Sequence, residues 1–236
     1  MFKNKKVNKF EWDGTLVDSI GMWNKTDEIL IKKLAGDDNI FVDNIGRIRG
    51  EMLSKNKSKD IYLEYCGYLG KKYNSSLSSE EILSLRRQIS SEYVKTQIDY
   101  KPNADTLLHL LKHKGYTLVL ATTTTNVQLN AYRNENLNIK RKANIDDIFE
   151  VVLSKDDVNE KKPNPEVHNK ILKILNVKQE ECLIIEDSLI GVQAAVNAGI
   201  DVAVVYDIYS DENRKVINEL SQYQFNNFDE IIKTLD

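Results

Sequence analysis

The carboxylates of Glu11 and Asp13 are the residues of this 236-residue chain that most directly suggest chemistry. They occur in the segment FEWDGTLVDS, directly after residues 7–10, which we predict to form a short strand. In an extended chain, positions two apart point to the same side, so both carboxylates can project from the carboxyl end of that strand. Gly14 then allows the chain to turn away. Paired carboxylates of this kind can act as nucleophile, general acid and base, or metal ligands.

Three later segments supply the other groups that such chemistry needs. Thr122 opens a run of four threonines after the apolar stretch TLVLA, Lys162 lies in the loop KKPNPE, and Glu186 and Asp187 follow the apolar stretch CLII. If the strands are parallel, their carboxyl ends meet at one edge of the sheet. The alternative readings are acidic residues near helix starts, a solvated lysine, and turn-forming threonines, which we favour for Thr124 and Thr125.

The elements that must position these groups alternate in the second half of the chain. Short, continuously apolar stretches at 117–121, 150–153, 182–185 and 201–205 are typical of strands buried on both faces. Amphipathic segments lie between them, and one of these ends at Gly199, a plausible helix C-cap. The alternation predicts an α/β fold with a doubly wound, Rossmann-like parallel sheet.

Residues 20–98 show helical periodicity and no convincing strand. Ser78 followed by Glu81 is a capping box that predicts the start of one of these helices. We therefore predict an α/β core domain formed by residues 1–19 and 99–236, interrupted by an inserted α-helical cap domain at residues 20–98.

Composition limits the partners. Lys and Arg number 33 against 36 Asp and Glu, a net charge of −3, which removes the electrostatic reason to expect nucleic-acid binding. Cys66 and Cys182 lie far apart, so the sequence supports neither a disulfide framework nor a thiolate metal site. No apolar run approaches the length of a membrane span. We expect a cytoplasmic monomer with no membrane partner.

Four motifs, in this order and spacing, resemble those of the haloacid dehalogenase-like superfamily. They are FEWDGTLVDS, LVLATTTT, KKPNPE and IIEDSLIGVQAAVNAG, and they span nearly the whole chain. The resemblance is to the phosphatase-like members that carry a helical cap after the first motif, such as phosphoglycolate phosphatase and β-phosphoglucomutase. It implies a hydrolase that acts on a small phosphorylated metabolite.

The resemblance also implies roles for single residues. Position 11 is the nucleophile that forms a covalent acyl-phosphate, Asp13 is the general acid and base, and Thr122 and Lys162 bind the phosphoryl oxygens. A magnesium cofactor, Mg²⁺, is held by Glu11, Asp13, Glu186 and Asp187, which offer the oxygen ligands that this ion prefers. Gly14, Thr123 and Arg49 complete the implied set as substrate-binding residues.

The chain departs from the family pattern at position 11, where the family has aspartate and this chain has glutamate. The extra methylene moves the carboxylate by ~1.5 Å, and a misplacement of about 1 Å can cost on the order of 10²-fold in rate. We therefore expect weak or absent turnover. The alternatives are a catalytically disabled phosphate-binding protein and a sugar-phosphate mutase, although the histidine usual in such mutases shortly after the first motif is missing.

The strand before the first motif is unusual because it contains Asn8 and Lys9. A central parallel strand normally carries apolar side chains on both faces, and an unpaired buried ammonium is costly. We expect the Lys9 ammonium either to find a carboxylate partner or to reach solvent at an edge, unless the active centre of this chain has drifted from its family.

Overall fold

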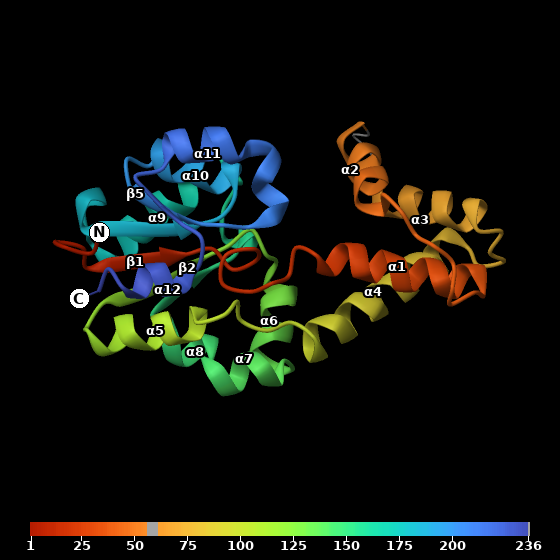
Figure 1. Ribbon diagram of the computed structural model, residues 1–236, viewed down its shortest axis with the longest axis horizontal. Helices are drawn as coiled ribbons and strands as arrows, with labels where there is room; N and C mark the ends of the chain where they lie inside the picture. Colours follow the sequence, from red (N-terminus) through yellow and green to blue (C-terminus); the bar gives the residue numbers. More distant parts are fainter. Residues whose placement is uncertain (56–60, 236) are drawn as a thin grey trace. The chain divides into compact units, whose positions relative to one another are not determined.

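A six-stranded parallel sheet forms the centre of one compact unit of the chain (Figure 1). Its parallel, doubly wound arrangement was predicted, whereas its sixth strand was not. The computed structural model describes residues 1–55 and 61–235. The strand order is β3-β2-β1-β4-β5-β6, so the two halves of the sheet wind outward from β1. The strands are β1 Val7–Phe10, β2 Thr117–Ala121, β3 Val151–Leu153, β4 Cys182–Glu186, β5 Asp201–Val205 and β6 Tyr223–Phe225.

Helices cover both faces of this sheet. Figure 1 shows α9, α10 and α11 on one side and α5 and α12 on the other. Gly199 adopts a left-handed φ of 68° just after α10, as expected of a glycine that ends a helix. These helices are α5 Ala104–His113, α6 Asn126–Asn134, α7 Leu137–Lys142, α8 Ile145–Ile148, α9 Glu166–Leu175, α10 Leu189–Asn197, α11 Arg214–Leu220 and α12 Phe228–Ile232.

One internal segment of the chain forms a helical unit. Two compact units are present, one made of Met1–Ile20 with Ile98–Asp236 and the other of Gly21–Gln97. Over its described residues, 21–55 and 61–97, the second unit packs its own apolar core and holds four helices, one of which begins at the predicted capping box of Ser78 and Glu81. They are α1 Met22–Ala35, α2 Ile45–Lys55, α3 Ile61–Lys72 and α4 Ser79–Thr96. The role of this unit as a cap stays a prediction. In the described part of the chain, no helix is both long and apolar enough to cross a membrane.

Strand β1 is buried along its whole length, and it buries Lys9 with it. The Lys9 side chain is 0% exposed, so the expected route to solvent is wrong. Its ammonium lies 3.4 Å from the main-chain oxygen of His168 in α9, and no carboxylate among the described residues pairs with it. Asn8 is equally buried, and its side-chain amide has no hydrogen-bond partner in the described structure. Both residues carry a desolvation cost in the centre of the sheet.

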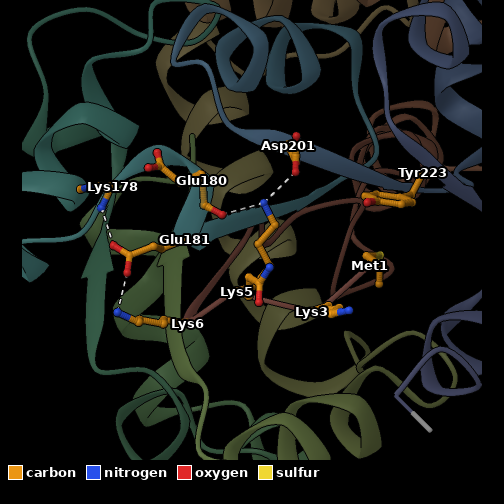
Figure 2. Close-up of a pocket in the computed structure, with 10 residues that line it drawn as sticks. Met1, Lys3, Lys5, Lys6, Lys178, Glu180, Glu181, Asp201 and Tyr223 are labelled. Atoms are coloured by element: carbon orange, nitrogen blue, oxygen red, sulfur yellow. Dashed lines mark hydrogen bonds and ion pairs between the residues drawn. The ribbon is translucent and has the colours of Figure 1, made fainter.

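The amino edge of the sheet carries a hollow of about 670 Å³ (Figure 2). Its charges largely satisfy one another: the Lys5 ammonium lies 2.7 Å from the Asp201 carboxylate, and Lys6 lies 2.5 Å from Glu181. None of the predicted site residues lines this hollow. The candidate site is at the opposite edge, where the strands end.

Candidate active site

Three neighbouring strands end at the candidate site. Strand β1 pairs with β2 and with β4 so that Phe10 is level with Leu120 and with Ile185. The residues that follow those positions therefore meet at one edge of the sheet. Glu11 continues β1 through a hydrogen bond of 3.1 Å from its N–H to the carbonyl of Ile185. Thr122 comes directly after β2, and Glu186 is the last residue of β4.

Glu11 lies at the centre of this edge and is 4% exposed. One carboxylate oxygen accepts hydrogen bonds from the Thr122 hydroxyl and, at 3.0 Å, from the main-chain N–H of Trp12. The other oxygen lies 2.5 Å from the Lys162 ammonium. Burial raises the pKa of Glu11, and the nearby Glu186 adds to this rise while Lys162 opposes it. Glu11 thus occupies hydroxyl, amide and ammonium donors at the carboxyl end of the sheet.

Lys162 reaches the site from the loop before α9 and is almost fully buried. Its ammonium donates to Glu11, to Glu186 at 2.8 Å and to the main-chain oxygen of Ala121 at 3.0 Å, which engages all three of its N–H groups. Burial alone would lower the pKa of Lys162, but the two carboxylates more than offset this and raise it. The lysine is therefore a fixed positive charge.

Both carboxylate oxygens of Glu186 accept hydrogen bonds. One accepts from Lys162, and the other accepts from the main-chain N–H groups of Asp187 at 2.9 Å and Ser188 at 3.1 Å, and from the Ser188 hydroxyl at 3.0 Å. The carboxylate lies over the first turn of α10, where a Cβ on Gly191 would overlap it. Glu186 thus orients Lys162 and satisfies donors at the start of α10.

Asp187 packs against the turn that follows Glu11 and Asp13, which brings the first and fourth motifs together. It is 3% exposed and accepts a hydrogen bond of 2.5 Å from the hydroxyl of Thr15. Gly14 adopts a φ of +79°, and a Cβ at that position would lie 2.6 Å from an Asp187 oxygen, so both the conformation and the space require glycine. Burial, with Glu186 adding to it, raises the pKa of Asp187 well above its usual range.

Asp13 is half-buried and held by hydroxyl groups. Ser19 donates to Oδ1 at 2.5 Å, Tyr132 donates to the same oxygen at 3.3 Å, and Thr124 donates to Oδ2. Sequence reasoning missed all three contacts, although Ser19 and Thr124 lie inside the quoted motifs. Thr125 does cap α6 as a turn residue, whereas Thr124 is part of the site.

The two other predicted substrate-binding residues are Thr123 and Arg49. Thr123 is exposed, and its side chain makes no hydrogen bond among the described residues. Arg49 belongs to the helical unit, where its guanidinium pairs with Asp27 and donates to the side chain of Asn24 at 2.8 Å. The role of both residues in binding substrate stays a prediction.

The donor set of the site fits a divalent cation. Three buried acidic side chains, Glu11, Glu186 and Asp187, lie together, and the ammonium of Lys162 pairs with the first two. All candidate ligands are oxygens, as Mg²⁺ prefers. Within residues 1–55 and 61–235, however, no group of three or more His, Cys, Asp or Glu side chains is arranged so that it could hold a metal ion. A Mg²⁺ ion here would therefore be bound by one or two carboxylates and would keep several waters.

Comparisons with known proteins agree with this architecture. A phosphorylated carbohydrates phosphatase of Thermotoga maritima is 33% identical over 116 residues, 49% of each chain. The pyrophosphatase PpaX of Bacillus mycoides is 25% identical over 202 residues, 82% of this chain and 81% of that protein. The solved structure of a CbbY mutant from Rhodobacter sphaeroides in complex with xylulose-(1,5)bisphosphate is 22% identical, covers 95% of both chains and has a TM-score of 0.67.

Several curated relatives are matched over only about half to three fifths of their own length. The family match is broader: residues 10–205 match the sequence model described as haloacid dehalogenase-like hydrolase, from Glu11 and Asp13 through Asp187. The chain therefore belongs to the haloacid dehalogenase-like hydrolase family, as its four motifs predict.

Proposed function

We propose that this protein is a magnesium-dependent phosphatase that hydrolyses a small phosphate monoester through a covalent acyl-phosphate. The observation that supports this most strongly is the cluster around Lys162, whose ammonium lies 2.5 Å from Glu11 and 2.8 Å from Glu186, with the Thr122 hydroxyl on the far side of Glu11. A nucleophilic carboxylate, a fixed cation and a hydroxyl donor are what phosphoryl transfer to a carboxylate requires.

The proposed reaction uses the side chains in sequence. Lys162 and Thr122 orient the phosphoryl group, and the carboxylate at position 11 attacks phosphorus while Asp13 gives a proton to the leaving alkoxide. Asp13 then takes a proton from a water molecule, which attacks phosphorus and releases inorganic phosphate and the free carboxylate. A magnesium ion held by Asp187, the position 11 carboxylate and the main-chain oxygen of Asp13 would screen the charge between the phosphoryl oxygens and the carboxylates.

Glutamate at position 11 explains why we expect this turnover to be impaired. Its carboxylate accepts from Thr122, Lys162 and the Trp12 N–H, the donors that phosphoryl oxygens would otherwise take. Substrate must therefore displace a buried ion pair before it can bind. Aspartate would withdraw the carboxylate by about one methylene, ~1.5 Å, toward β1 and leave those donors free.

The substrate class is inferred from relatives. Similar proteins are named as a phosphatase of phosphorylated carbohydrates and as a pyrophosphatase, and one similar structure contains xylulose-(1,5)bisphosphate. These names support a small phosphorylated metabolite, with sugar phosphates as the first class to test.

Initial rates with 4-nitrophenyl phosphate test this proposal, measured with and without Mg²⁺ for the unaltered chain, Glu11→Asp and Glu11→Gln. In the presence of Mg²⁺, we expect the rate of the Glu11→Asp variant to exceed that of the unaltered chain by about 10²-fold. The shorter side chain removes a misplacement of the carboxylate of more than about 1 Å. Glu11→Gln controls for length and should be inactive. The phosphatase assignment would be refuted if none of the three proteins hydrolyses either 4-nitrophenyl phosphate or sugar phosphates. Equal rates with and without Mg²⁺ would refute the magnesium dependence.

A further inference from the structure

Tyr132, which lies outside the four motifs, donates a hydrogen bond to Asp13, the proposed acid and base of the reaction. It lies on α6, is 1% exposed, and its hydroxyl is 3.3 Å from Oδ1 of Asp13. A phenol is protonated at neutral pH, so Tyr132 is the donor in this contact and the Asp13 carboxylate is the acceptor.

The ring of Tyr132 is fixed by an aromatic cluster built on the residue between Glu11 and Asp13. The ring of Trp12, which is fully buried, lies 5.3 Å from that of Tyr132 at an interplanar angle of 67°. On the other side of Trp12 lies Tyr100, 5.7 Å away at 75°. Edge-to-face pairs at such distances are favourable and orient the rings. The phenol hydroxyl thus approaches Asp13 from a helix, whereas Ser19 and Thr124 approach from loops.

The distribution of donors distinguishes the two oxygens of Asp13. Oδ1 accepts from both Ser19 and Tyr132, which uses its two lone-pair directions, while Oδ2 accepts from Thr124 alone. A carboxylate that exchanges a proton with a leaving group needs one free direction on the exchanging oxygen. That direction remains on Oδ2.

We propose that Tyr132, held by Trp12, is a positioning residue that fixes Oδ1 of Asp13 and directs Oδ2 toward the leaving group. The proposal rests on the proposed phosphatase function and adds to it a residue outside the four motifs. Without the phenol hydroxyl, one direction on Oδ1 is vacant and the Asp13 carboxylate can rotate. Proton delivery then weakens, while Lys162 and Thr122 still bind the phosphoryl group.

Tyr132→Phe tests this because it keeps the ring and removes the hydroxyl. The matched control is Tyr100→Phe, which removes a buried hydroxyl from the same cluster, one that donates to the main-chain oxygen of Ala143 at 2.6 Å instead of to Asp13. Each variant is made in the unaltered chain and in Glu11→Asp. Values of kcat and KM are measured with an alkyl ester, glycerol phosphate, and with 4-nitrophenyl phosphate, whose leaving group needs little protonation.

We expect Tyr132→Phe to lower kcat for glycerol phosphate by about 10-fold or more at unchanged KM, since general acid catalysis contributes 10²- to 10⁴-fold. Its kcat for 4-nitrophenyl phosphate should change by less than about 3-fold, and Tyr100→Phe should change neither ester by more than that. Ser19→Ala, which removes the other donor to Oδ1, should show the same dependence on the leaving group and serves if Tyr132→Phe does not fold.

Equal losses for the two esters, or a Tyr132→Phe variant that behaves like Tyr100→Phe, would overturn the positioning role while the phosphatase assignment stands. If the parent proteins turn over neither ester, the proposed function fails, and the role of Tyr132 fails with it. The two failures are therefore distinguishable.

Discussion

Replacement of Lys9 by methionine should stabilise this protein at neutral pH. Lys9 lies in the central strand β1, fully buried, and its ammonium is 3.4 Å from the main-chain oxygen of His168. Burial lowers the pKa of Lys9 to about 8, with only a partial opposing effect from Cys182. Burial and the positive charges of Lys162 and Lys9 hold the pKa of His168 well below its usual range, so this ring stays neutral and adds no second positive charge. Methionine is unbranched like lysine, lacks the terminal ammonium and carries no charge.

The pKa shift of Lys9 sets the size of the effect. A fall from 10.5 to about 8 corresponds to about 3 kcal/mol of native-state destabilisation at pH 7, at about 1.4 kcal/mol for each unit. Between these two values the unfolded chain binds more protons than the folded chain, so the free energy of unfolding rises with pH in this window. The advantage of Lys9→Met should therefore shrink from about 3 kcal/mol at pH 7 to about 1 kcal/mol at pH 10.

Urea unfolding at pH 7, 8, 9 and 10 measures this difference. Circular dichroism and tryptophan fluorescence would both follow the transition, measured in a Trp23→Phe background so that the signal comes from Trp12, which lies in the same unit as Lys9. The control is Lys215→Met, at an exposed position on α11, which should change stability by less than about 0.5 kcal/mol at every pH. A destabilised Lys9→Met variant, or a difference that does not vary with pH, would show that the Lys9 charge is not the source of the cost.

Two further substitutions test the site: one removes the cation that pairs with its buried carboxylates, and the other crowds the Glu186 carboxylate. Lys162→Met should lower the free energy of unfolding by about 3 to 5 kcal/mol at pH 7, because it leaves the carboxylates of Glu11 and Glu186 buried without a cation; a loss below about 1 kcal/mol in chemical unfolding would contradict this. Gly191→Ala should cost about 1 to 3 kcal/mol, since its Cβ would overlap the Glu186 carboxylate. Gly50→Ala is the control, with nothing within 4 Å of its Cβ, and equal effects of the two substitutions would argue against the proposed crowding.

The sheet could be predicted because its strands are continuously apolar and alternate with amphipathic helices. That pattern identified β2, β3, β4 and β5, and the parallel arrangement then required the carboxylates after β1 and β4 to meet at one edge. Strand β6, Tyr223–Phe225, was missed because three partly exposed residues give no periodic signal. The same holds for α8, which has four residues and is too short to show a helical period.

The contacts within the site were less predictable than its location. Tyr132 has no polar signal in the sequence, because an aromatic residue on a buried helix face is usually core, and its hydroxyl matters only through its distance from Asp13. The sequence also could not indicate that the Glu186 carboxylate would form an ion pair with Lys162. From the sequence alone, Glu186 is only an acidic neighbour of Asp187. The sequence did show that Lys9 is unusual for a central strand. Whether its ammonium reaches water depends on how α9 packs on β1, and the hydrophobic periodicity of the sequence does not specify that packing.

The central claim is that the carboxylate at position 11 attacks phosphorus. Mass spectrometry of the Glu11→Asp variant, quenched in acid during turnover of a phosphate monoester with Mg²⁺, tests it most directly. We predict a phosphoryl adduct that maps to residue 11 and is absent from Glu11→Gln. An adduct on another residue, such as Asp13, or turnover in Glu11→Gln at the rate of Glu11→Asp, would contradict this account.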